Sequence, residues 1–257
     1  MLFNVIILSI IEGVTEFLPV SSTAHLILMS DILSMDKSFY EVFNVVIQMG
    51  SILAVVWLYP QQFKQFIAAP FQRQQLTIGL AILPVLIIGY LLKDIIKSVL
   101  FSPATIFAGL IIGGIGLIIA DFKVKYQSDN DDRETITYKQ ATMIGIWQCL
   151  ALWPGMSRSA MTIMGGLAVG LNRTTAASFS FIIAVPLLII ICSYDLFSAV
   201  PRFSLAQLGY IGLGTLLSFF IALFTMRWFL KLIQFKGLSI FGVYRIILGS
   251  IGFLFYL

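Results

Sequence analysis

The sequence predicts an all-α membrane protein with several transmembrane helices. Of its 257 residues, 59% are hydrophobic and 11% are charged, whereas about a quarter of the residues of a soluble domain are charged. The mean hydropathy is +0.99. Apolar stretches long enough to cross a bilayer recur along the whole chain, and they lack the alternation of polar and apolar residues that membrane β-strands show.

Hydropathy predicts six spans and two interrupted apolar segments. The spans are expected at residues 40–59, 76–93, 102–120, 176–193, 207–230 and 238–257. The segments 2–30 and 140–172 each contain a proline followed by polar residues, in "EFLPVSSTAH" and "LWPGMSRSAMT". Proline stops a helix, and the serines after it suit the cap of the next helix. We therefore expect each segment to form a re-entrant hairpin of two short helices, with a break that is buried or lines a wet cavity.

The basic residues predict the orientation of this arrangement in the membrane. If each hairpin returns to its own side, ten lysines and arginines lie on one face and four on the other, and the richer face is cytoplasmic. The ten are Lys64, Arg73, Lys123, Lys125, Arg133, Lys139, Arg173, Arg227, Lys231 and Lys236, and the four are Lys37, Lys93, Lys97 and Arg202. The first hairpin then enters from the extracytoplasmic side, where both termini lie, and the second enters from the cytoplasm.

The two hairpins divide the chain into similar halves. When Pro19 is aligned with Pro154, "EGVTEFLPVSSTAH" falls on "WQCLALWPGMSRSA", and three spans follow each hairpin. Because three is odd, the second half is inverted relative to the first. We expect a single integral membrane domain, residues 1–257, with inverted halves at roughly 1–125 and 136–257 that are joined by the acidic loop 126–135. This plan places the site near the midplane, where the broken helices meet.

Polar side chains are concentrated at the first break. Glu12 and Glu16 are four residues apart and share a helix face, and ionisable groups inside a membrane are functional by default. The pair suits a divalent cation or a proton; the structural alternative is a helix interface or contact with lipid headgroups. The residues after the proline are Ser21, Ser22, Thr23 and His25, the only histidine of the chain.

Ser22 is a candidate helix cap, and His25 follows it by three residues. A hydroxyl and an imidazole at this separation suit a nucleophile and base, or part of a metal and phosphate shell. The alternative is a cap beside a structural histidine. At the second break, Arg158 offers a planar fork of donors for phosphate oxygens, and a helix N-terminus supplies free N–H groups. The alternative for Arg158 is a structural ion pair with Glu12 or Glu16.

Together these groups predict a pocket for phosphate or diphosphate, and its depth in the membrane predicts a substrate with a lipid tail. Arg245, in "VYRIILGS", is either a pocket residue or an anchor that reaches the headgroups. Gln48 and Gln148 either line the cavity or form hydrogen bonds between helices. The net charge of +4 is modest, so nucleic acid is not an expected partner.

The two polar motifs resemble those of the undecaprenyl-diphosphatase family, also called the bacitracin resistance proteins. The resemblance rests on "EGVTEFLPVSSTAH", on "PGMSRSAMT" half a chain later, and on "QCLALWPG", "AVP" and the final "YR", and it covers essentially the whole chain. It implies hydrolysis of the terminal phosphate of undecaprenyl diphosphate to give undecaprenyl phosphate, the lipid carrier for peptidoglycan. It also implies a bacterial plasma membrane location, an active site on the extracytoplasmic side, and a required divalent cation.

The resemblance and the residues together give a hypothesis for the site. Ser22 attacks phosphorus and His25 takes its proton, although water or His25 itself are alternative nucleophiles. Arg158 grips the phosphate oxygens. The expected substrate-binding residues also include Ser21, Thr23, Ser157, Ser159 and Thr162. Glu12 and Glu16 are expected to hold Mg²⁺ or Ca²⁺, which prefer oxygen ligands.

Three other functions compete with hydrolysis. A flippase for polyprenyl phosphate lipids would use the same inverted plan, but a carrier needs no nucleophile and base. A type-2 phosphatidic acid phosphatase would need two histidines. A non-enzymatic bacitracin-binding or scaffold protein would leave the buried glutamates, histidine and arginine without a purpose. The sequence does not fix the oligomeric state, and a homodimer is compatible with it.

Overall fold

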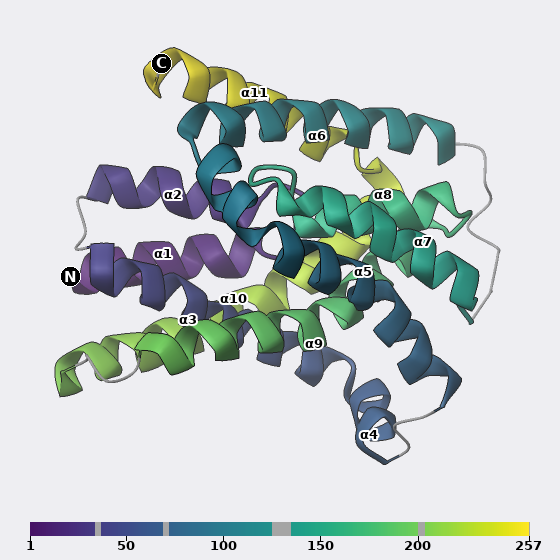
Figure 1. Ribbon diagram of the computed structural model, residues 1–257, viewed down its shortest axis with the longest axis horizontal. Helices are drawn as coiled ribbons and strands as arrows, with labels where there is room; N and C mark the ends of the chain where they lie inside the picture. The colour runs from purple at the N-terminus through teal and green to yellow at the C-terminus, as the bar shows by residue number, and fades with distance from the viewer. Residues whose placement is uncertain (34–36, 69–71, 125–134, 200–203, 257) are drawn as a thin grey trace.

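The structure is a computed structural model that describes residues 1–33, 37–68, 72–124, 135–199 and 204–256, all in helices or short connections (Figure 1). The helices in chain order are α1 (Leu2–Thr15), α2 (Ser22–Leu33), α3 (Lys37–Leu58), α4 (Pro60–Ala68), α5 (Arg73–Ile95), the π-helical turn η1 (Ile96–Leu100), α6 (Pro103–Val124), α7 (Tyr138–Cys149), the 3-10 turn η2 (Leu150–Leu152), α8 (Arg158–Ala168), α9 (Arg173–Ala199), α10 (Leu205–Lys236) and α11 (Ser239–Tyr256). Some predicted features lie outside the described residues: Lys125, Arg133, Arg202 and the loop 126–135 except for its last residue.

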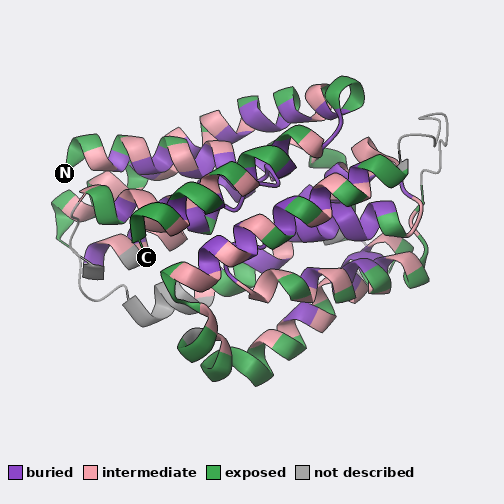
Figure 2. Cartoon of the chain, turned by 90° about the horizontal axis from the view of Figure 1, so that it is seen from above, coloured by how far each residue is buried: buried purple, intermediate pink, exposed green. Residues whose placement is uncertain are grey.

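The prediction of an all-α polytopic membrane protein is confirmed. Within the described residues, five helices are long and apolar enough to cross a membrane: α5, α6, α9, α10 and α11. The sixth predicted span, 40–59, lies in α3, whose apolar part Val42–Leu58 is shorter. Outward faces of these helices carry large apolar side chains, such as Phe220 and Phe224 on α10. Figure 2 shows the buried residues on the inward faces, as expected for helices surrounded by lipid.

The two interrupted segments fold as helix hairpins, as predicted. The α1–α2 hairpin lies at the end of the molecule that carries the N-terminus, and the α7–α8 hairpin lies toward the opposite end, with its tip near the centre (Figure 1). Ser21 directly precedes α2 and Ser157 directly precedes α8, and both have φ of 71°. A positive φ is unusual for a residue other than glycine and marks backbone held in place by its surroundings.

Small residues allow the long helices to approach closely. A Cβ atom at Gly114 of α6 would lie 2.7 Å from the Gly242 carbonyl oxygen of α11, and a Cβ at Gly242 would lie 2.7 Å from the Gly114 carbonyl oxygen. Similarly, a Cβ at Gly214 of α10 would lie 2.8 Å from the Phe43 ring of α3. Contact through small residues is the usual way in which membrane helices pack. The α6–α11 contact matters for the site because α11 carries Arg245.

A salt bridge and two hydrogen bonds to Asp121 join the ends of three helices. Arg173, at the start of α9, donates from Nε to Asp121 Oδ1 of α6 at 2.7 Å. Ser239, at the start of α11, donates to Asp121 Oδ2 from its backbone N at 3.0 Å and from its hydroxyl at 2.6 Å. Asp121 therefore caps α11 and ties it to α6 and α9, which fixes the register of the helix that reaches the centre.

Candidate functional site

The tips of the two hairpins are bonded to each other at the centre of the molecule. Arg158, the first residue of α8, donates from Nη2 to Glu16 Oε1 at 3.0 Å and from Nη1 to the Ser180 carbonyl of α9 at 3.2 Å. Ser159 donates to the Leu18 carbonyl at 2.7 Å. The guanidinium carbon also lies 5.5 Å from the centre of the Phe17 ring. Glu16 and Arg158 are 142 positions apart in the sequence. The residues of the two motifs thus form one cluster.

Arg245 holds the backbone of both tips. Its side chain is fully buried. It donates to the Pro19 carbonyl of the first tip at 3.2 Å and to the carbonyls of Gly155 and Met156 of the second tip at 2.9 Å each. Two further bonds reach α6 carbonyls, at Gly109 and Leu110. Of the two alternatives for Arg245, the headgroup anchor is wrong, because the guanidinium lies inside the protein and bonds to backbone carbonyls there.

The two carboxylates lie at the C-terminal end of α1. Glu16 is its C-cap residue and Glu12 lies one turn earlier, so the predicted shared face is confirmed. The C-terminus of a helix disfavours negative charge, so these groups need cationic neighbours. Glu16 has Arg158, whereas no hydrogen bond of the described residues reaches either carboxylate oxygen of Glu12, which is fully buried. The charges of Glu16 and Arg158 act on the Glu12 carboxyl group, and the Ser51 hydroxyl lies near it.

Ser22 is the first residue of α2 rather than its cap. Its hydroxyl donates to Glu16 Oε2 at 2.5 Å. Ser21 occupies the position before the helix because the backbone turns there with a positive φ. The second break differs by one residue, since three residues separate Pro154 from Arg158 but two separate Pro19 from Ser22. There, the Ser157 hydroxyl caps α8 by accepting from the Ala160 N–H at 3.3 Å.

His25 is held at both ring nitrogens, and neither contact is with Ser22. Nδ1 lies 2.8 Å from the Ser21 carbonyl oxygen, and Nε2 lies 2.6 Å from the Tyr244 hydroxyl of α11. In the described residues, the predicted Ser22–His25 pair is therefore not hydrogen bonded. Both residues do lie in the first turn of α2, so the structure brings them to the same helix end.

The other predicted binding residues divide into buried and exposed ones. The Thr162 hydroxyl lies 2.6 Å from the Ser180 hydroxyl, and the Ser157 hydroxyl lies 3.2 Å from that of Ser159. All four are buried. These hydroxyls extend a polar layer behind Arg158. Thr23, by contrast, is exposed, so the described structure does not bring it into the cluster.

Three residues of the cluster escaped the sequence analysis. Ser180 lies in the middle of the apolar α9, Ser51 lies in α3, and Tyr244 precedes Arg245 in α11. Single hydroxyls inside apolar spans are common in membrane helices, where they bond to the preceding turn or to neighbouring helices. The only available signal was the family-like "YR" pair, which contains Tyr244.

Gln48 and Gln148, for which the sequence allows either a cavity lining or a hydrogen bond to another helix, both form hydrogen bonds to neighbouring helices. Gln148 Nε2 of α7 donates to the Ala81 carbonyl of α5 at 3.2 Å. Gln48 Oε1 of α3 accepts from Cys192 of α9 at 3.5 Å. The helix-to-helix alternative therefore accounts for both contacts.

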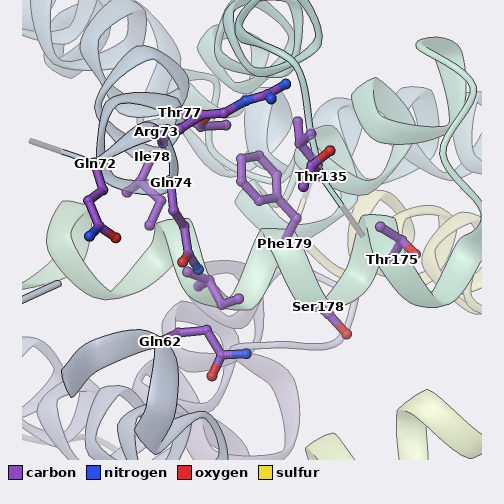
Figure 3. A pocket seen from close by; sticks show the side chains of 12 residues that line it. Gln62, Gln72, Arg73, Gln74, Thr77, Ile78, Thr135, Thr175, Ser178 and Phe179 are labelled. Atoms are coloured by element: carbon purple, nitrogen blue, oxygen red, sulfur yellow. The ribbon is translucent and has the colours of Figure 1, made fainter. Parts of the chain in front are cut away.

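Two cavities lie outside the cluster. One, of about 410 Å³, is enclosed by α4 and the first turns of α5 and α9, and its walls include Arg73, Thr175 and Phe179 (Figure 3). The other, of about 520 Å³, is an apolar groove between α6 and the α7–α8 hairpin that begins beside Met156. Neither cavity is lined by Glu16, Ser22 or Arg158.

A divalent cation fits the donor set only in part. The described residues contain no group of three metal-ligating histidine, cysteine, aspartate or glutamate side chains. Mg²⁺, however, is commonly held by one or two carboxylates together with water and substrate phosphates. The unpartnered oxygens of Glu12, beside Glu16, match that kind of site. A buried polar group without a partner is rare, and an ion is one of the explanations for it.

The fold and the cluster define a class: a polytopic α-helical membrane protein with a buried arginine, hydroxyls and two helix N-termini gathered at the tips of two hairpins. The chain belongs to the family described as bacitracin resistance protein BacA, whose model matches residues 5–251.

Named relatives agree with this membership. The chain is 40% identical over 259 residues to an undecaprenyl-diphosphatase of Clostridium tetani, covering 98% of this chain and 95% of that protein. It is 43% identical to an undecaprenyl-diphosphatase of a Sulfurihydrogenibium species, with 98% of each chain covered. It is 42% identical to an undecaprenyl-diphosphatase of Wolinella succinogenes, covering 100% of this chain and 98% of that protein.

Proposed function

We propose that this protein is an undecaprenyl-diphosphatase, which hydrolyses the terminal phosphate of undecaprenyl diphosphate and leaves undecaprenyl phosphate. The observation that carries the proposal is the bonded unit of Ser22, Glu16 and Arg158 at the junction of the hairpin tips, in a chain whose relatives bear that name. The unit combines a hydroxyl, a proton acceptor and a phosphate-binding cation in one place. A flippase is less favoured, since transport does not call for this chemistry.

Phosphate binding is assigned first to Arg158. Its Nη atoms bond Glu16 and Ser180, but its buried Nε has no partner among the described residues. This N–H is a donor available to a phosphate oxygen, and the N-termini of α2 and α8 add positive potential on the same side. Ser157 and Ser159 hold the start of α8 in position for this contact.

Ser22 is assigned as the nucleophile, with Glu16 as its proton acceptor. The Ser22 hydroxyl already donates to Glu16 Oε2, which supports Glu16 for this step in place of His25. The Ser22 oxygen attacks the terminal phosphorus, and the bridging P–O bond breaks. The leaving group is undecaprenyl phosphate, a stable anion, so the protein chiefly has to position the groups and neutralise charge.

The second step returns the enzyme to its resting form. Water attacks the phosphoserine and releases inorganic phosphate, and His25 is assigned as the base for this water. His25 is three residues beyond Ser22 on the same helix and has a ring nitrogen that can accept a proton. A direct attack by water and an attack by His25 remain the alternatives to the phosphoserine.

Glu12 and Glu16 are assigned to hold a divalent cation, Mg²⁺ or Ca²⁺. A bound cation would neutralise charge on the diphosphate oxygens. The support comes from the unpartnered carboxylate of Glu12. We further propose a plasma membrane location with the site open to the extracytoplasmic side, which rests on the distribution of basic residues. A homodimer stays a prediction.

Phosphate release from undecaprenyl diphosphate by the purified, detergent-solubilised protein tests this function. We expect release by the wild type, and loss of release with a chelator, in Ser22→Ala and in His25→Ala. Ser30→Ala is the matched control, because Ser30 is a buried serine of the same helix whose hydroxyl donates to the Ile27 carbonyl and lies outside the cluster. No release from a folded wild type supplied with Mg²⁺ or Ca²⁺ would reject the enzyme and favour lipid transport.

A further inference from the structure

We propose that Tyr244 is a positioning residue for His25. Its hydroxyl donates to Nε2 and, together with the Ser21 carbonyl at Nδ1, holds the imidazole in the tautomer that carries its proton on Nδ1. The tautomer is a property of the resting protein. Only its catalytic consequence rests on the proposed function.

The contact between the two side chains is close and well aligned. The Tyr244 oxygen lies 2.6 Å from His25 Nε2, and the ring planes are 9° apart with centroids separated by 5.7 Å. The residues come from α2 and α11 and are 219 positions apart. A near-parallel arrangement of this kind fixes the imidazole in two ways, by ring contact and by a hydrogen bond at its far nitrogen.

The direction of each hydrogen bond follows from the Ser21 carbonyl. A carbonyl oxygen only accepts, so the 2.8 Å contact from His25 Nδ1 requires a proton on Nδ1. In the neutral ring, Nε2 then has a lone pair and must accept. The Tyr244 hydroxyl is therefore the donor, and the other tautomer, protonated on Nε2, would leave the Ser21 carbonyl opposite a lone pair.

The position of Tyr244 is itself fixed by its neighbour. Arg245, the next residue of α11, is bonded to the backbone of both hairpin tips and to α6. The direction in which Tyr244 points is thus set by the same helix that holds the tips.

The consequence for the reaction is the availability of the Nε2 lone pair. Of the two ring nitrogens, only Nε2 can take a proton, because Nδ1 is occupied by the Ser21 carbonyl. Tyr244 is half exposed, with 44% of its surface accessible, so its hydroxyl can turn away when substrate or water needs Nε2. Tyr244 thus keeps a base ready without becoming one itself.

The single histidine of the chain makes the tautomer directly measurable. Protein labelled with ¹⁵N only in histidine gives one pair of ring-nitrogen NMR signals. We expect the wild type to show a protonated Nδ1 and an unprotonated Nε2. In Tyr244→Phe the Nε2 signal should move, because this nitrogen loses its donor, while the Ser21 carbonyl keeps the proton on Nδ1. Tyr256→Phe, on the same helix and in contact with the Phe107 ring, is the control and should leave the spectrum unchanged.

Kinetics provide the second readout. Tyr244→Phe removes one oxygen atom at a partly exposed position, so the thermal midpoint should match that of the wild type. We expect kcat to fall about 10-fold, as for other partners that orient a reacting histidine, with little change in KM. A wild type protonated on Nε2, or an unchanged spectrum and kcat in Tyr244→Phe, would overturn the assignment. If the wild type releases no phosphate, the proposed function fails while the NMR result still decides the role of Tyr244.

Discussion

Glu12 illustrates how a residue that is costly for stability can be part of the proposed cation site. Its carboxylate is fully buried and no hydrogen bond of the described residues reaches it, whereas Glu16 is paired with Arg158 and Ser22. Neutralising an uncompensated buried charge stabilises the folded state. Neutralising one partner of a buried ion pair destabilises it, because the other charge is left unpaired. The two glutamates should therefore respond in opposite ways to neutralisation.

We expect Glu12→Gln to keep or raise the thermal midpoint while phosphate release is lost. The amide has nearly the same shape as the carboxylate but carries no charge, so the folded state is relieved while the cation loses a ligand. Differential scanning fluorimetry in detergent measures the midpoint, and titration with Mg²⁺ measures the stabilisation by the cation, which should be strong in the wild type and weak in the variant.

Glu16→Gln is the matched control for this prediction. It leaves the partly buried Arg158 guanidinium opposite a neutral group, so the midpoint should fall. A lower midpoint in Glu12→Gln than in Glu16→Gln, or full activity in Glu12→Gln, would show that Glu12 is a structural residue.

The sequence predicts which polar residues lie at the two breaks better than it predicts their hydrogen-bond partners. Glu16, Ser22, His25 and Arg158 were identified because polar groups in an apolar chain are conspicuous. The pairing of Ser22 with Glu16 and of His25 with Tyr244 was not predicted. Tyr244 is one of nine tyrosines, and its contact with His25 depends on the packing of the last helix, which no local pattern reveals.

At the scale of helices, the contact of α6 with α11 determines where Arg245 lies. A Cβ atom at Gly113 of α6 would collide with the Arg245 guanidinium nitrogen and would lie 3.2 Å from the Met156 carbonyl oxygen. Gly113 therefore provides the space in which Arg245 bonds the second tip. Gly79, in α5, is helical too, but a Cβ there would meet nothing within 4 Å.

We expect Gly113→Ala to lower both the thermal midpoint and phosphate release, because the added methyl group displaces Arg245 from the tips. Gly79→Ala should be neutral or slightly stabilising, by up to about 1 kcal/mol, since alanine restricts the unfolded chain more than glycine does. Thermal unfolding and the phosphate assay on both variants check this. Equal effects in the two variants would mean that Arg245 tolerates a shift or that Gly113 acts only through helix propensity.

Helix positions were largely predictable from hydropathy and proline. The serines and charged residues after Pro19 and Pro154 predict breaks there, whereas Pro84 and Pro186 lie within apolar stretches and remain inside α5 and α9. The short α4 and the π-helical turn η1 were not expected. Their boundaries depend on contacts between chain segments and on local backbone geometry, which composition alone does not encode.

The whole molecule is proposed to consist of two inverted halves. Support comes from the hairpins at opposite ends of the molecule (Figure 1) and from the matching serines with positive φ, Ser21 and Ser157. Inversion predicts that the bases of the two hairpins lie on opposite sides of the membrane. In the proposed orientation, the base of the first hairpin is extracytoplasmic and the base of the second is cytoplasmic. Phe3 and Lys139 are exposed residues at these two bases.

Single cysteines at these positions, in a Cys149→Ser, Cys192→Ser background, test the inversion in spheroplasts. We expect a membrane-impermeant thiol reagent to label Phe3→Cys in intact spheroplasts and Lys139→Cys only after the membrane is disrupted. Labelling of both from one side would reject the inverted plan, and labelling with the sides exchanged would reverse the proposed orientation. The unsubstituted background serves as the unlabelled control.

The bonds from Arg245 also set the order in which the protein can mature. Pro19 is synthesised early, whereas Arg245, which donates to its carbonyl, is synthesised 226 residues later. Until α11 has been synthesised and inserted, the tips of both hairpins lack the cation that holds their backbone. A nascent chain that ends within α10 would therefore contain every glutamate, serine and histidine of the cluster and still have no ordered place for a diphosphate. We therefore expect the protein to become competent only after the last helix has been inserted into the membrane.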